Sequence, residues 1–257
     1  RVYTLIFPPD LTVTAGLHGW WLLPAALVSL AIGMIGILAA RHLDRLVAFA
    51  VIGSMGMVMI SIALFTPEGI GAALYYIVHS TLAAGALFLI SDLARAGRAN
   101  LDLTAQPPMA GANLTAAMFF VGAIAMAGLP PLSGFVGKLL ILDASFDTPQ
   151  MVWVWAIVLG ASLISVVGFA RAGSILFWKA NSVAAPEDTP AVARPSALSY
   201  VAVGGLLALL VAHTVFAGPA TTYTTAMAKQ LFTPDAYMTT VLTSKGKMSD
   251  AKSQGDH

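Results

Sequence analysis

The chain has 257 residues, of which 58% are hydrophobic and only 10% are charged, and its mean hydropathy is +0.83. Soluble domains carry about 25% charged residues, so this composition is typical of a membrane protein. The net charge of +1 supports no nucleic-acid partner. The absence of cysteine excludes disulfides and thiolate metal sites.

Six long apolar stretches predict membrane-spanning helices, because a span needs about 20 mostly apolar residues. Residues 1–7 are expected to be the end of a further helix that is truncated at Arg1. The predicted fold class is therefore an all-α, polytopic transmembrane helix bundle, and stretches of this length exclude the short alternating strands of a barrel. The six predicted spans cover about residues 22–40, 46–65, 69–91, 113–145, 151–176 and 198–217.

Basic residues gather in alternate connections between these spans. The connections at 8–21, 66–68 and 144–150 contain no lysine or arginine. Because positive loops stay in the cytoplasm, the stretch 113–145 is expected to run from the cytoplasm outward. The seven basic residues of the other connections are Arg41, Arg45, Arg95, Arg98, Arg171, Lys179 and Arg194.

The chain becomes more polar after Gly218, with scattered Tyr, Met, Phe and Leu. This pattern predicts an interfacial helix near 220–243, followed by a flexible C-terminal tail that ends at residue 257. Alternation of the spans places the tail outside.

The stretch 113–145 is interrupted near its middle by Gly128, Pro130, Pro131 and Gly134. Proline donates no backbone hydrogen bond and clashes with the preceding turn, so the pattern predicts a broken helix. Freed carbonyls at membrane depth must be met by water, side chains or neighbouring helices. The alternative is a kink that serves packing alone.

Lys138 follows the break within the same apolar stretch. Charged residues at bilayer depth are costly and usually functional, and a buried amine can load and release a proton because burial disfavours its charged form. The alternative is that the long stem carries the amine to the outer interface. Asp143 is either the exit of a proton path or a solvated helix end. His213 is expected to anchor the last span at the interface, and Arg171 to snorkel.

His79 lies in an apolar run with no charged residue between Glu68 and Asp92. Imidazole can accept a proton on one nitrogen and donate from the other, which suits a proton relay. Ser80 and Thr81 would then support a chain of hydrogen-bonded water. The alternative is a hydrogen bond that only holds two helices together.

No Walker loop, dinucleotide fingerprint or HExxH motif occurs, so we expect no soluble-enzyme activity, no cofactor and no metal site. The segment AGLPPLSGFVGKLLIL instead resembles the discontinuous helix of the antiporter-like family shared by Mrp-type cation/proton antiporters and respiratory complex I. The segment RHLDRLVAFAVIGSMGMVMISIAL is similar to an earlier element of that family. The segments YYIVHSTLAAGALFLISDL, FARAGSILFWK and AMAKQLFTPDAYMTTVL look most like the D-type subunit of the Mrp complex.

The resemblance implies a fold of about fourteen helices with two inverted repeats, of which this chain would be the C-terminal half. Lys138 would match the terminal lysine of the family's buried polar axis, and His79 the histidine of the preceding long helix. The family's essential glutamate and other lysines would lie upstream of Arg1. Some relatives carry a lysine about one turn after the histidine, where this chain has Ala83 and Ala84.

The function implied by the resemblance is that of a subunit in a multisubunit Na⁺/H⁺ antiporter, a secondary transporter of the bacterial inner membrane. The implied partners are other membrane subunits, the ions Na⁺ and H⁺, and the lipid bilayer. Two alternatives stay open. One is a proton-pumping subunit of complex I or of a membrane-bound hydrogenase, and the other is a purely structural membrane scaffold.

Overall fold

In a computed structural model, the chain forms a helical bundle. The structure describes residues 18–98, 100–109, 111–184 and 195–233, together with Thr4 and Thr239. Five helices in this part are long and apolar enough to cross a membrane, and its secondary structure contains no named strand. The predicted all-α, polytopic class is confirmed. Except for Thr4 and Thr239, the predicted helix end at 1–7 and the tail beyond residue 233 lie outside the described residues.

Helices α2 (Leu23–Ala39) and α3 (Leu43–Ala63) form an antiparallel hairpin, because only three residues connect them. Their backbones meet so closely at Gly33 that a Cβ there would overlap the backbone of Gly53. Small residues permit this approach between membrane helices. Helix α4 (Pro67–Arg98) follows and is the longest described helix at 32 residues, or about 48 Å.

The predicted broken span consists of two short helices, α5 (Ala112–Ala127) and α6 (Ser133–Ala144). Both pack against α4, and both also contact α7 (Met151–Gly173). Helix α7 continues into a π-helical turn at Ser174–Trp178 and a 3₁₀ turn at Lys179–Ser182. The break in the middle of the bundle therefore lies between α4 on one side and α7 on the other.

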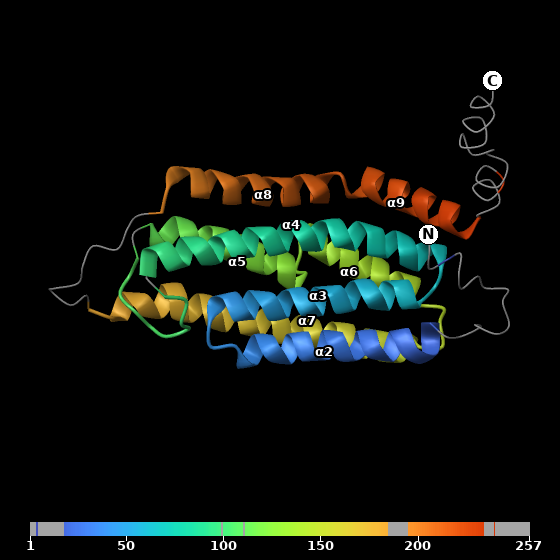
Figure 1. Ribbon diagram of the computed structural model, residues 1–257, viewed down its shortest axis with the longest axis horizontal. Coiled ribbons are helices and arrows are strands. Elements are labelled where there is room, and N and C mark those ends of the chain that lie inside the picture. Colours follow the sequence, from blue (N-terminus) through green and yellow to red (C-terminus); the bar gives the residue numbers. More distant parts are fainter. Residues whose placement is uncertain are drawn as a thin grey trace, which may run out of the picture.

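Helices α8 (Ala197–Val215) and α9 (Ala217–Phe232) follow one another along the outside of α4 (Figure 1). A Cβ added at Gly71, near the start of α4, would contact Thr225 of α9. The helix predicted near 220–243 thus begins earlier, at Ala217, and its described part ends at Phe232. It continues the bundle along α4 instead of standing apart from it.

The described basic residues of the connections between the predicted spans lie together at one end of the bundle, where α2, α4 and α7 end and α3 and α8 begin (Figure 1). Arg171 donates from Nη2 to the Ala40 carbonyl at 2.7 Å, just after α2 ends. A cation there is favoured by the negative end of the helix dipole. Arg171 therefore holds α7 to α2 rather than extending freely to the interface.

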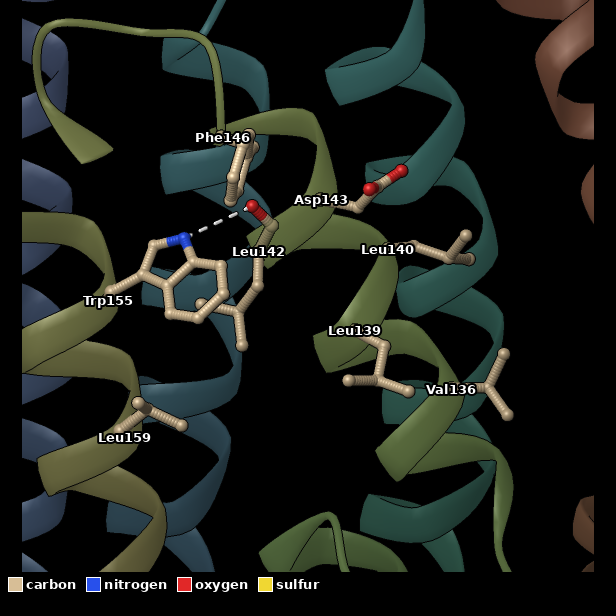
Figure 2. A pocket seen from close by; sticks show the side chains of 8 residues that line it. All are labelled: Val136, Leu139, Leu140, Leu142, Asp143, Phe146, Trp155 and Leu159. Carbon is tan, nitrogen blue, oxygen red and sulfur yellow. Dashed lines mark hydrogen bonds between the residues drawn. The ribbon is translucent and has the colours of Figure 1, made fainter. Parts of the chain in front are cut away.

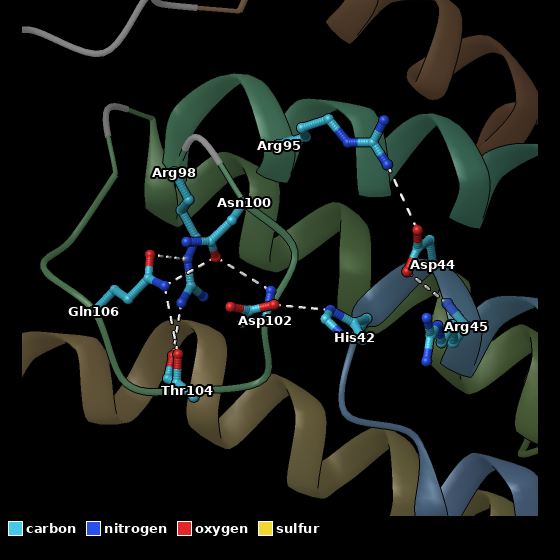
Figure 3. A network of polar contacts seen from close by, with 9 residues as sticks. All are labelled: His42, Asp44, Arg45, Arg95, Arg98, Asn100, Asp102, Thr104 and Gln106. Carbon is cyan, nitrogen blue, oxygen red and sulfur yellow. Dashed lines mark hydrogen bonds and ion pairs between the residues drawn. The ribbon is translucent and has the colours of Figure 1, made fainter.

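The segment after α4 folds back across the same end (Figure 3). His42 Nδ1 lies 2.7 Å from the Asp102 carboxylate, and the two residues also form an isolated backbone bridge. Arg98 donates from Nη2 to the Thr104 carbonyl at 2.7 Å. The weaker pair of Arg95 and Asp44, at 3.6 Å, joins α4 to the start of α3. These contacts tie the α2–α3 hairpin to α4 and to the segment that leads into α5.

The boundaries differ from prediction mainly where charged residues extend a helix. The sequence predicts an end near residue 91 for α4, but the helix runs to Arg98, because Asp92 and Arg95 lie at the polar end of the bundle, where charge is tolerated. Helix α3 starts at Leu43 rather than near 46. Gly134, predicted to belong to the break, lies within the first turn of α6.

Candidate functional site

The break begins where α5 ends at Gly128, whose φ of +72° is left-handed. The Gly128 N–H donates to the Ala125 carbonyl at 3.1 Å, and the Leu129 N–H donates to the Ile124 carbonyl at 3.0 Å. This is a common way for a helix to end at glycine. Pro130 and Pro131 follow and cannot donate to the carbonyls of α5. The Ala127 carbonyl is consequently available to another donor.

The side chain of Lys138, on α6, bonds to that carbonyl. Its Nζ donates to the Ala127 carbonyl and to Ser162 Oγ of α7 at 2.8 Å, and the residue is only 8% exposed. The side chain thus turns back toward the break. In this conformation the amine does not extend to the interface. The C-terminal end of α5 carries partial negative charge that attracts a cation.

Gly128 leaves the space that Lys138 fills. A Cβ at Gly128 would lie 2.7 Å from Nζ and 2.6 Å from Cδ and Cε of Lys138. The left-handed backbone also disfavours any side chain at this position. The break and the lysine are therefore parts of one arrangement, in which the residue that ends α5 also makes room for the amine.

His79 of α4 contacts the other end of the break. It is fully buried, and its Nδ1 lies 2.9 Å from the hydroxyl of Ser133, the first residue of α6. Its Nε2 is buried without a hydrogen-bond partner among the described residues. A Cβ at Gly134 would overlap the Ala125 carbonyl oxygen and lie 2.7 Å from His79 Nε2. Gly134 thus allows α6 to start directly against the imidazole.

The two predicted supporting hydroxyls lie in different environments. Ser80 is buried and donates to Ser54 Oγ of α3 at 2.8 Å. Thr81 is exposed, and its hydroxyl donates to the Ile77 carbonyl of its own helix at 2.8 Å. The structure joins Ser80 to a buried polar network but does not join Thr81 to it.

Asp143 lies at the exposed end of α6, on the rim of an apolar groove of about 690 Å³ between α6 and α7. Figure 2 shows its carboxylate pointing away from Trp155, whose Nε1 donates to the Leu142 carbonyl at 3.2 Å. No hydrogen bond or ion pair joins Asp143 to Lys138 in the described part. The position fits a solvated helix end better than a step next to the lysine.

Ser133 and Ser162, which hold His79 and Lys138, were not predicted from the sequence. In the sequence each is only one small hydroxyl residue in an apolar stretch, and Ser165 looks the same as Ser162 there. The structure also places His213 inside the α4–α8 contact, where its ring stacks on Tyr75 at 4.3 Å. His213 Nε2 lies 3.3 Å from the Tyr75 carbonyl. His213, in the last turn of α8, thus also joins this helix to α4.

Among the described residues, the ion pairs are those of His42 with Asp102 and of Arg95 with Asp44, so Lys138 has no acidic partner there. The same residues contain no group of His, Asp or Glu side chains that could hold a metal ion. The arrangement thus consists of two buried, ionisable side chains, each hydrogen-bonded to one end of a broken helix. Such an arrangement can hold and exchange protons.

The model of the NADH:quinone oxidoreductase/Mrp antiporter transmembrane family matches residues 2–165. The chain belongs to this family. It is 32% identical over 252 residues to the D-type subunit of the Na⁺/H⁺ antiporter of Bacillus subtilis, covering 94% of this chain and 48% of the relative. It is 29% identical over 272 residues to the D-type subunit of a probable K⁺/H⁺ antiporter of Rhizobium meliloti, covering 94% and 49%. The resemblance inferred from the sequence is confirmed.

The fold is also similar to that of a chain in the solved Mrp complex from Dietzia sp. The TM-score is 0.75 at 21% identity, and the match covers 90% of this chain and 51% of the other. The chain spans about half the length of the curated relatives it matches. The family and its helical membrane fold follow from these matches.

Proposed function

We propose that this chain is part of the D-type subunit of an Mrp-type multisubunit antiporter in a bacterial inner membrane, where it exchanges a monovalent cation for protons. The observation that carries the proposal is the burial of Lys138 against the freed Ala127 carbonyl at the break. A membrane protein spends free energy to bury a lysine, and intramembrane lysines usually serve transport. In this proposal Lys138 carries the proton, and His79 is a neighbouring relay.

The cation is proposed to be Na⁺, as named for the Bacillus relative with 32% identity. The Rhizobium relative is named for K⁺, so both ions belong in any transport assay. The partners are other membrane subunits of the complex. In this role the chain is a transporter component and not a soluble enzyme.

The second candidate function is proton pumping in a subunit related to complex I, since the matching family includes NADH:quinone oxidoreductase. The two candidates differ in what drives the proton. An antiporter responds to a cation gradient alone, whereas a pump requires electron transfer in an attached arm. A purely structural scaffold predicts neither response.

The test replaces Lys138 with alanine in the complete complex, expressed in bacteria that lack their own antiporters. Everted vesicles are energised, Na⁺ or K⁺ is added, and the collapse of the pH gradient is followed with a fluorescent dye. We expect Lys138→Ala to abolish the response while the amount of assembled complex is unchanged. Lys179→Ala is the matched control, because Lys179 is exposed at the end of the bundle and should leave transport normal.

Normal cation-driven proton movement in assembled Lys138→Ala complexes would overturn the proposal. A wild-type complex that responds to neither cation but moves protons during electron transfer would favour the second candidate instead.

A further inference from the structure

A row of three buried hydroxyl groups lies between α3 and α4, near Lys138. Ser80 donates to Ser54 Oγ at 2.8 Å, and Ser54 donates to the Tyr76 hydroxyl at 3.4 Å. All three residues are at most 2% exposed. Buried polar groups of this kind are normally satisfied by partners. The Tyr76 hydroxyl accepts from Ser54, so its own hydrogen needs an acceptor.

A small cavity separates this row from the lysine. Its wall contains Ser54 and Tyr76 on one side and Lys138 and Ser162 on the other. The rest of the wall is apolar and comes from α2, α3, α5 and α7, at Leu30, Met34, Ala50, Met57, Met126, Val158 and Ala161. The space open to the centre of a water molecule is about 10 Å³, close to the roughly 10–15 Å³ that one water requires.

The polar groups in this wall suit one bound water. Lys138 uses two donors on Ala127 and Ser162, and an ammonium has three. A hydroxyl both donates and accepts, so Tyr76 can give a hydrogen bond to a water or take one from it. A buried water typically makes about three hydrogen bonds to such groups.

We propose that one water in this cavity links Lys138 to the Tyr76–Ser54–Ser80 row, and that the row acts as a reversible hydrogen-bond partner for the lysine. When Lys138 is charged, its N–H donates to the water, and the hydroxyls donate in the order from Tyr76 to Ser54 to Ser80. When Lys138 is neutral, its lone pair accepts from the water, and the hydroxyls donate in the order from Ser80 to Ser54 to Tyr76 and then to the water. Hydroxyl groups turn easily between these directions, so both forms of the buried amine are solvated.

The titratable groups on the helices packed around Lys138 are few. In its middle part α4 brings Tyr75, Tyr76 and His79, and α8 brings His213 near its end. The other ionisable groups of these helices and of α6 lie toward their ends: Glu68, Asp92, Arg95 and Arg98 of α4, Asp143 of α6 and Tyr200 of α8. Helices α2 and α5 contain no ionisable side chain, while those of α3 and α7 lie at the basic end of the bundle. No carboxylate in the described part shares the role of the water and the row.

This inference rests on the proposed function and names positioning residues for it. The first test is Tyr76→Phe, which removes one oxygen, with Tyr75→Phe as its matched control because Tyr75 is equally buried but bonds to His213 instead. The second test is Ala161→Val, which fills the cavity without changing a polar group. Ser91→Ala is its control, since the Ser91 hydroxyl bonds within its own helix.

Antiport per assembled complex should fall by at least about tenfold in Tyr76→Phe and Ala161→Val, which is less than the roughly 10²–10⁴-fold contributed by a group that transfers the proton itself. Their pH profiles should also differ from that of the wild type, because the amine loses a hydrogen-bond partner in both its charged and its neutral form. The double variant should be no worse than either single variant, since both remove the same link. The two controls should match the wild type.

Wild-type rate and pH profile in both Tyr76→Phe and Ala161→Val, with Lys138→Ala inactive, would overturn this inference and leave the proposed function intact. Activity in Lys138→Ala would overturn the proposed function itself. Equal losses in Tyr76→Phe and Tyr75→Phe would also refute the row, since they would reflect packing of α4 in general.

Discussion

The two ends of the broken helix hold their ionisable side chains in different ways. At the end of α5, Lys138 meets a carbonyl, a hydroxyl and the wall of a water-sized cavity. At the start of α6, His79 meets one hydroxyl through Nδ1, while its Nε2 is packed near the Ala125 carbonyl without a hydrogen bond in the described part. The lysine has several partners, and the histidine has one.

Because of this difference, the two side chains are not equally suited to hold a proton. The negative end of the α5 dipole attracts a cation at Lys138, whereas the positive end of α6 repels one at His79. Lys138 can therefore hold a proton in the conformation observed. For His79 to act as a relay, its Nε2, which is packed close to the Ala125 carbonyl, would need a partner to exchange a proton with, such as a water.

The largest expected effect comes from closing the space for the amine with Gly128→Ala. The new Cβ would lie 2.7 Å from Nζ, and a non-glycine residue in a left-handed conformation costs about 1–3 kcal/mol. We expect antiport per assembled complex to fall nearly as far as in Lys138→Ala. Gly160→Ala on α7 is the control, because a Cβ there meets nothing within 4 Å. Normal transport in Gly128→Ala would separate the break from the function of the lysine.

The next effect tests the histidine with His79→Gln, which keeps a hydrogen bond to Ser133 but cannot titrate in this range. A relay predicts slower transport and a changed pH profile in fully assembled complexes. A packing role predicts a lower yield of complex and a normal rate for each complex that assembles. Unchanged pH-dependent antiport per complex would leave His79 with the packing role alone, worth about 1 kcal/mol or less.

A smaller effect is expected from Ser162→Ala, which removes one of the two hydrogen bonds to Lys138. Hydrogen bonds to charged groups contribute about 1.5–3 kcal/mol, but the water in the cavity can replace part of this loss. We expect antiport to fall by a factor well below that of Gly128→Ala. Ser165→Ala is the matched control, since this buried hydroxyl of α7 has no hydrogen-bond partner among the described residues. Equal rates in the two variants would show that Ser162 does not hold the amine.

The smallest effect is expected from Asp143→Asn. Its carboxylate is exposed on the rim of the α6–α7 groove, and surface substitutions usually change stability by no more than about 0.5 kcal/mol. The measured antiport rate should stay within about twofold of the wild type. A loss comparable to that of His79→Gln would restore Asp143 to the proton path.

The sequence predicted the helices and the break because both depend on local chemistry. Apolar length marks a span, and Pro130 with Pro131 marks the interruption. It also singled out Lys138 and His79 as candidates, because an ionisable group in an apolar run stands out. The helix ends were less accurate, since the charges of Asp92 and Arg95 interrupt the apolar run but not the helix.

The partners of these residues could not be predicted, because they depend on how separate helices face one another. Ser162 is 24 residues from Lys138, and Ser133 is 54 residues from His79. Thr81 and Ser80 are adjacent in sequence and look equivalent there, yet neighbouring positions on a helix point about 100° apart. Only Ser80 therefore reaches the hydroxyl row.

The most direct test of the central claim, that Lys138 carries the proton, is the antiport rate of Lys138→Arg in the purified complex. Proteoliposomes are given a cation gradient, and internal pH is measured over a range of external pH. Arginine keeps the positive charge and the donors but does not release its proton in this range. We expect a normally assembled complex with no antiport at any pH. Antiport at the wild-type rate would show that the charge alone is needed and would contradict the account.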